Sequence, residues 1–139
     1  MTEHKPHIDY EKMLYRRSAD TLKVHGILSI TFGILGVLTA LFITTLMGIG
    51  AFAEYSYAPY SYDSSIGFFM LSLIVFIFWT LPHIYLIIAG SYLVREPSAQ
   101  LAKVLVIINL VVGVFWNLIL AVFSIINLTQ IADYERLKK

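Results

Sequence analysis

Three long stretches of the chain carry no charged side chain, and this feature constrains the fold more than any other. Residues 24–53, 64–94 and 104–132 contain no Asp, Glu, Lys or Arg. Each stretch is longer than the roughly 20 apolar residues that cross the hydrocarbon core of a bilayer. Because 58% of the residues are hydrophobic and the mean hydropathy is +0.76, the sequence predicts an all-α integral membrane protein.

The charged residues predict how the chain is oriented in the membrane. The link 54–63 has no Lys or Arg, whereas the link after the second stretch carries Arg95 and Lys103. By the positive-inside rule the first link lies outside and the second lies in the cytoplasm. The tail before the first stretch is also basic, and its Lys and Arg residues are Lys5, Lys12, Arg16, Arg17 and Lys23.

The third stretch leaves two topologies open. Extended back to Pro97, it is about 35 residues long and would form one helix of ~52 Å. That length exceeds the ~30 Å hydrocarbon core. Two helices of ~17 residues would be at the short end of the spanning range, with a turn between Gly113 and Asn117. Four membrane crossings would return the basic carboxyl-terminal tail to the cytoplasm, and we prefer this topology. The alternative is three crossings, which would leave that tail outside.

The predicted organisation is a helical bundle with short tails. It comprises a cytoplasmic tail at 1–23, helices at about 24–53, 64–94, 98–114 and 117–132, a Tyr-rich outer loop at 54–63 and a cytoplasmic tail at 133–139.

The second link supports the four-helix interpretation. It reads Gly90-Ser91-Tyr92-Leu93-Val94-Arg95-Glu96-Pro97-Ser98-Ala99-Gln100-Leu101-Ala102-Lys103, followed by the apolar residues 104–110. Over roughly residues 84–134 the chain resembles small bacterial four-helix integral membrane proteins of mostly unknown function. Gln100 stands where those proteins usually have a basic residue, and the turn lacks their common Pro. The resemblance implies a four-helix topology in the bacterial inner (cytoplasmic) membrane, and it implies no activity.

Small residues recur at steps of three and four along the first stretch, which places them on one helix face. Such a face lets a second helix approach closely, so we expect a packing or partner interface there. The sequence does not show whether the second helix is internal or belongs to another subunit. The residues of this small-residue face are Gly26, Ser29, Gly33, Gly36 and Ala40.

The outer loop is rich in tyrosine, and two interpretations apply to it. Tyrosine is enriched at membrane interfaces, so the loop can form an aromatic belt. Alternatively, its rigid amphipathic rings can form an outer surface that docks a partner. The residues concerned are Tyr55, Tyr57, Tyr60 and Tyr62.

Few polar residues lie in the middle of the apolar stretches, and they are the candidates for an intramembrane polar site. His83 follows Pro82, which should kink the helix and free a backbone carbonyl for the imidazole. We interpret His83 mainly as a structural histidine, with a ligand or substrate contact as the alternative. In a four-helix topology Asn109 and Asn127 flank the turn and could form an interhelical clamp.

Nothing in the sequence indicates an enzyme. The chain has no Cys, which excludes disulfides and thiolate metal sites. We expect no catalytic residue, no bound cofactor, no metal site and no nucleic-acid partner. The leading hypothesis is a non-catalytic accessory or structural subunit of a larger membrane protein complex, in contact with the lipid bilayer and with other subunits or itself. The alternative is a small homo-oligomeric channel or transporter lined by His83, Asn109 and Asn127.

The topology makes a direct prediction about the two chain ends. A reporter that is active only in the cytoplasm should be active when it is fused to Lys139, because the basic residues place both termini there. A silent cytoplasmic reporter, together with an active periplasmic one at the same residue, would contradict the four-span topology.

Overall fold

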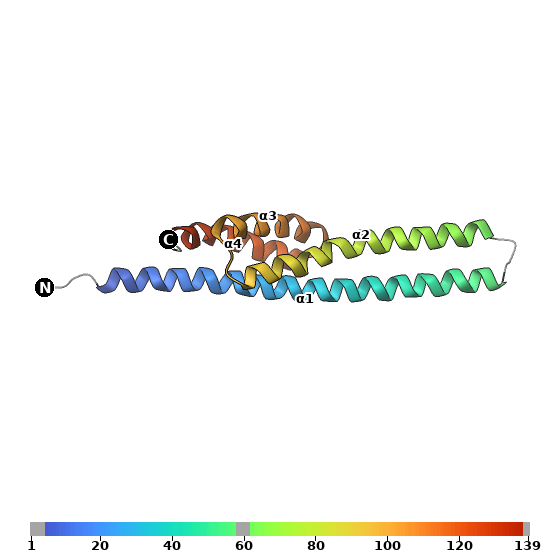
Figure 1. The fold of residues 1–139 in the computed structure, drawn as a ribbon, viewed down its shortest axis with the longest axis horizontal. Helices are drawn as coiled ribbons and strands as arrows, with labels where there is room; N and C mark the ends of the chain where they lie inside the picture. Colours follow the sequence, from blue (N-terminus) through green and yellow to red (C-terminus); the bar gives the residue numbers. More distant parts are fainter. Residues whose placement is uncertain (1–4, 58–61, 138–139) are drawn as a thin grey trace. The chain divides into compact units, whose positions relative to one another are not determined.

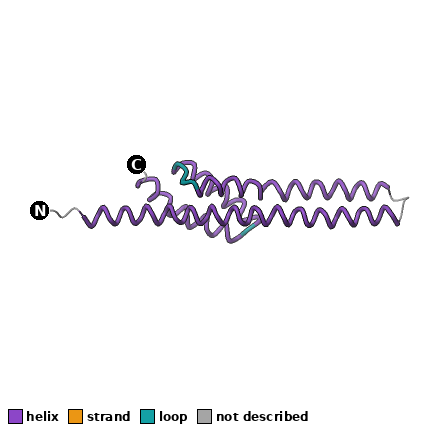
Figure 2. Tube along the Cα trace, turned by 60° about the horizontal axis from the view of Figure 1, so that its bottom comes forward, coloured by secondary structure: helices purple, strands orange, loops and turns teal. Residues whose placement is uncertain are grey.

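The structure is a computed structural model that describes residues 5–57 and 62–137, with the side chains of 5–9, 54–55 and 62–65 left aside. It contains four helices: α1 (Lys5–Tyr57), α2 (Tyr62–Val94), α3 (Ala99–Trp116) and α4 (Leu118–Leu137) (Figure 1). Within the described residues there is no strand, and only short links interrupt the helices (Figure 2). All four helices are long and apolar enough to cross a membrane, which indicates an integral membrane protein. The expected all-α, four-helix fold is therefore confirmed.

Helix α1 begins much earlier than hydropathy suggests. We expected a tail up to residue 23, but the helix starts at Lys5 and continues to Tyr57. The early turns have their own buried side, because Ser18, Ala19 and Leu22 are covered. The Lys, Arg and Glu residues around them also have good helix propensity. A helix of 53 residues has a contour length of ~80 Å, so part of α1 must lie outside a hydrocarbon core of ~30 Å.

The described chain packs as two units. The first consists of α1 up to Thr31, the end of α2 from Leu86, and the whole of α3 and α4; the second is Phe32–Tyr85. In the first unit buried residues recur every three or four positions, as they do where helices pack along a common seam. On α4 the buried residues are Leu120, Ala121, Ser124, Asn127, Ile131 and Tyr134.

Two glycines allow α1 and α2 to touch in the first unit. A Cβ atom on Gly26 would lie 2.7 Å from the carbonyl oxygen of Gly90. A Cβ atom on Gly90 would lie 2.5 Å from the carbonyl oxygen of Gly26. Any side chain at either position would push the helices apart. The glycines therefore fix the closest approach of α1 to α2.

Helices α3 and α4 form a tight hairpin around one residue, Asn117. Its backbone N–H donates to the carbonyl oxygen of Gly113 at 2.7 Å, which closes the end of α3. Its side-chain Oδ1 accepts from the N–H groups of Ile119 (3.1 Å) and Leu120 (3.3 Å), which caps the start of α4. A Cβ atom on Gly113 would lie 2.6 Å from the backbone nitrogen of Ala121, so glycine is required for the helices to come together.

The second unit pairs the later part of α1 with the first part of α2. Few of its side chains are buried, and among them are the small residues Gly33, Gly36 and Ala40. Helix α2 continues through Pro82 without a break. Most large apolar side chains of this unit are exposed, as expected for surface that faces lipid.

Removing the Asn117 cap should weaken the hairpin. We expect Asn117→Ala to lower the free energy of unfolding in detergent by about 1 kcal/mol, because two N–H groups of α4 lose their acceptor. Asn117→Asp keeps an acceptor oxygen and should retain most of the stability. An equal loss in both variants, measured by denaturant titration followed by circular dichroism, would show that the cap is unimportant.

Candidate functional site: a buried polar cluster

The most polar part of the protein interior surrounds His25 in the first unit. The imidazole is fully buried, with 0% of its surface exposed, and its neighbours are between 0% and 1% exposed. The residues come from α1, α3 and α4 and are separated by as many as 102 positions in the sequence. We call this group, which consists of His25, Ser29, Asn109, Ser124 and Asn127, the His25 cluster.

Both ring nitrogens of His25 are engaged. The amide nitrogen of Asn109 lies 3.2 Å from Nε2, and that of Asn127 lies 3.0 Å from Nδ1. The Oγ atom of Ser124 is a further neighbour of Nε2, at 3.4 Å. Asn109 also donates to the Oγ atom of Ser29 at 3.1 Å. The imidazole thus joins α1 to α3 through one nitrogen and to α4 through both.

Hydrogen-bond chemistry decides which ring nitrogen carries the proton. A neutral imidazole has one donor and one acceptor nitrogen. The amide nitrogen of Asn127 also donates to the carbonyl oxygen of Phe123 at 2.8 Å, and a carbonyl can only accept. This fixes the Asn127 amide as a donor to Nδ1. Nε2 must then carry the hydrogen and needs an oxygen as its acceptor.

The oxygen placed to accept the Nε2–H of His25 is Oγ of Ser124. The hydrogen of that hydroxyl goes to the carbonyl oxygen of Leu120 at 2.8 Å, so its lone pairs face the ring. The Ser29 hydroxyl likewise donates to the carbonyl oxygen of His25 at 2.9 Å and accepts from the amide nitrogen of Asn109. The cluster contains no carboxylate, so it suits a neutral ring. Its hydrogen bonds connect three helices, and each interhelical hydrogen bond stabilises the packing by about 1 kcal/mol.

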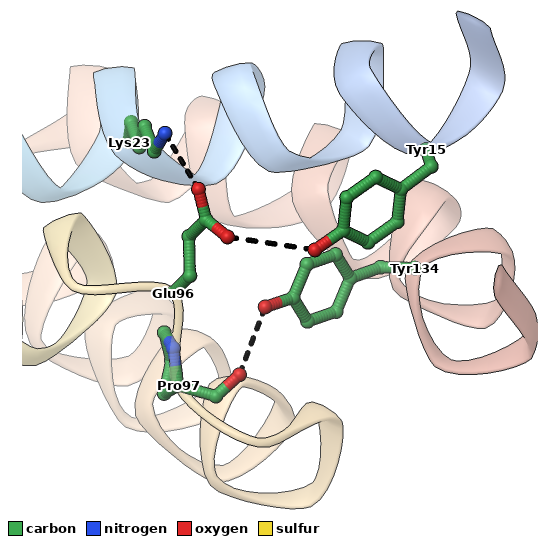
Figure 3. Close-up of polar contacts among 5 residues, drawn as sticks. All are labelled: Tyr15, Lys23, Glu96, Pro97 and Tyr134. Carbon is green, nitrogen blue, oxygen red and sulfur yellow. Dashed lines mark hydrogen bonds and ion pairs between the residues drawn. The ribbon is translucent and has the colours of Figure 1, made fainter. Parts of the chain in front are cut away.

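A second group of polar contacts lies around the link between α2 and α3 (Figure 3). The carboxylate of Glu96 accepts from the Nζ atom of Lys23 at 2.6 Å and from the hydroxyl of Tyr15 at 3.4 Å. The Tyr134 hydroxyl donates to the carbonyl oxygen of Pro97 at 2.9 Å, and its ring stacks on Tyr15 with centroids 5.6 Å apart. These five residues, which we call the Glu96 latch, connect α1, the link and α4.

Glu96 also has an unusual backbone conformation. Its φ angle is +54°, and no other described residue, glycine included, has a positive φ. Such a left-handed residue commonly ends a helix, where glycine is preferred, and it costs a side-chain-bearing residue about 1–3 kcal/mol. The ion pair with Lys23 and the Tyr15 hydrogen bond engage both carboxylate oxygens, which explains why Glu rather than Gly suits this position.

Asn109 and Asn127, which the sequence predicts to come close, both contact His25. His83 belongs to the second unit. Its Nδ1–H donates to the carbonyl oxygen of Trp79 at 2.6 Å, and its ring stacks on that indole with centroids 6.0 Å apart. The ring occupies the space where a side chain on Gly36 would otherwise lie. In the described residues no group of three or more His, Asp or Glu side chains could hold a metal ion.

The small-residue face is buried along its whole length within the chain itself; its members are Gly26, Ser29, Gly33, Gly36 and Ala40. Tyr57, at the end of α1, is 90% exposed. Tyr60 and the side chains of Tyr55 and Tyr62 lie outside the described residues. The outer tyrosine surface therefore stays a prediction.

Sequence reasoning missed His25 as a polar centre. His25 lies next to the first charged tail, at the start of the first charge-free stretch, whereas His83 stands out in the middle of an apolar stretch. A signal was present: His25 precedes Ser29 by four positions and so shares the buried side of α1. The sequence could not reveal that both asparagines face it.

The fold and the polar cluster define a four-helix integral membrane protein whose interior is held by a histidine and two asparagines. No protein-family model matches the chain, and no curated protein or solved structure matches it either.

Replacing His25 tests the cluster. We expect His25→Leu to lower the free energy of unfolding in detergent by about 3 kcal/mol, because the side chains of Asn109, Asn127 and Ser124 lose a partner while they stay buried. His83→Phe, which removes one hydrogen bond to a carbonyl, should cost about 1 kcal/mol.

A triple apolar variant provides the control. Combining His25→Leu with Asn109→Leu and Asn127→Leu removes the orphaned amides together with the imidazole, so it should recover most of the lost stability. A single variant as stable as the wild type would show that the cluster contributes little.

Proposed function

We propose that this protein is a non-catalytic accessory or structural subunit of a larger membrane protein complex. The observation that carries the proposal is the contrast between the two units. The first unit uses its polar side chains to hold its own helices together. The second unit has an apolar surface with open positions that suit another transmembrane helix.

Most buried polar groups of the first unit are engaged internally, whereas Oδ1 of Asn109, Oδ1 of Asn127 and Oε1 of Gln130 are buried without a hydrogen-bond partner. Both nitrogens of His25 have partners, and the carboxylate of Glu96 has two. The asparagines of the His25 cluster are at most 1% exposed. This arrangement supports a structural role for these residues and gives a substrate no exposed polar surface in the cluster.

The outer part of α1 offers a surface for a partner. Phe42 and Phe52 are 65% and 73% exposed. A Cβ atom on Gly48 or on Gly50 would meet nothing within 4 Å. Apolar helices in a bilayer associate where small residues permit close approach. The chain leaves these two glycines uncovered, so they suit contact with a helix of another subunit.

The sequence left open whether the small-residue face meets a helix of this chain or of another subunit. The small-residue face from Gly26 to Ala40 is buried within the chain, with Gly26 against Gly90 and Gly36 against His83. We therefore assign the association to residues 42–52 of α1, next to the exposed Tyr57. For the location, the basic residues of the tails favour a bacterial cytoplasmic membrane with both termini inside.

The alternative, a homo-oligomeric channel, has less support. A path between subunits needs polar side chains on the outer surface of each subunit. Asn109 and Asn127 instead point into the first unit, and His83 is only 8% exposed.

The test is purification of the tagged chain in mild detergent. We expect unlike membrane subunits to be recovered with it. The double variant Gly48→Leu/Gly50→Leu should reduce their recovery about tenfold, which corresponds to about 1.4 kcal/mol, because the added bulk separates the helices. Leucine favours helix more than glycine, so α1 itself should not be weakened.

A matched control changes neighbouring exposed residues without adding bulk. Leu46→Ile/Ile49→Leu should leave the recovery of partners unchanged. A closed homo-oligomer with no other subunit would contradict the proposal and favour the channel.

A further inference from the structure

One side of α1 forms a groove with α4 in the first unit. Its volume is about 560 Å³. The lining residues of α1 follow one another at steps of three and one, which places them on a single helix face. Phe123 of α4 also lines this open groove, and the α1 residues are Met13, Arg16, Arg17, Asp20, Thr21 and Val24.

The groove changes from charged to apolar along its length. Arg16 and Arg17 lie at one end, and Val24 begins the charge-free stretch of α1. Val24 lies seven positions after Arg17, which corresponds to ~10 Å along the helix. Phe123 adds an apolar ring to the wall. The charged end of the groove therefore suits the membrane interface, and its apolar end suits the hydrocarbon region.

The two arginines are available to bind an anion. Both are exposed, and within the described residues neither forms an ion pair. Lys23 is different, because it is held by Glu96 at 2.6 Å. Asp20 also lines the groove, so the lining side chains carry one net positive charge. Guanidinium groups bind phosphate in a bidentate manner, which an ammonium group does not.

We propose that this groove binds an anionic phospholipid. Its phosphodiester lies at Arg16 and Arg17, and its acyl chain lies against Val24 and Phe123. A basic pocket between membrane helices at the interface is a general binding site for anionic lipid head groups. The apolar half of the groove points to a lipid rather than a free phosphate ion, which would use only the arginine end.

Native mass spectrometry of the detergent-purified full chain tests the site, with phosphatidylglycerol and phosphatidylcholine as probes. We expect the wild type to retain phosphatidylglycerol in preference to phosphatidylcholine. Arg16→Gln/Arg17→Gln should reduce retention of phosphatidylglycerol about tenfold. Arg16→Lys/Arg17→Lys keeps the charge but loses the bidentate geometry. Its retention of phosphatidylglycerol should therefore lie between that of the wild type and that of Arg16→Gln/Arg17→Gln.

The control variant removes the same charge elsewhere. Arg95→Gln/Lys103→Gln should retain phosphatidylglycerol like the wild type, because neither residue lines the groove. Equal losses in the control and in Arg16→Gln/Arg17→Gln would overturn the proposal, since they would show general attraction to the basic surface. Displacement of the lipid by an equal concentration of inorganic phosphate would overturn it too, because it would identify a site for a free anion. Unchanged melting temperatures ensure that each variant is folded.

Discussion

The hydrogen bonds of His25 are the constraint on which the first unit depends. Inside a bilayer a buried polar group cannot turn to water, so its partners must come from the protein. His25 finds them on α3 and α4 through two asparagines and a serine. A shift of either helix by one turn, about 5.4 Å, would separate these groups and leave several unpaired. The cluster thus selects one register among the many that apolar packing alone would permit.

The Glu96 latch and the Gly26–Gly90 contact complete this arrangement. The glycines set how closely α1 approaches α2, and the latch attaches α1 to the link that follows α2. Tyr134 then connects α4 to the same link through Pro97. Directional interactions therefore join α1, α3 and α4, whereas α2 is held by the glycine contact and by the link that follows it. The second unit has fewer such contacts and a more apolar exposed surface, which suits contact with lipid or another membrane protein.

Much of the fold could be predicted from the sequence, because hydropathy and helix geometry act locally. Helix length required the third stretch to fold back, and Asn117 supplied both a cap and a turn. Helix α1 begins at Lys5, well before the charge-free stretch. Hydropathy could not predict this start, because it does not detect a helix made of charged residues with good helix propensity. The role of His25 could not be predicted, because it depends on which faces of α3 and α4 point inward. Periodicity places residues on a face but does not say which helix that face meets.

The measurement that tests this account most directly is nitrogen NMR of the His25 ring. With ¹⁵N-labelled histidine in detergent micelles at neutral pH, the account predicts a neutral ring with hydrogen on Nε2 and none on Nδ1. Nδ1 should show a hydrogen-bond coupling to the side-chain amide of Asn127, and Asn127→Leu should abolish it. Two protonated nitrogens, or the averaged signals of a ring exchanging with water, would contradict a buried histidine that ties three helices together.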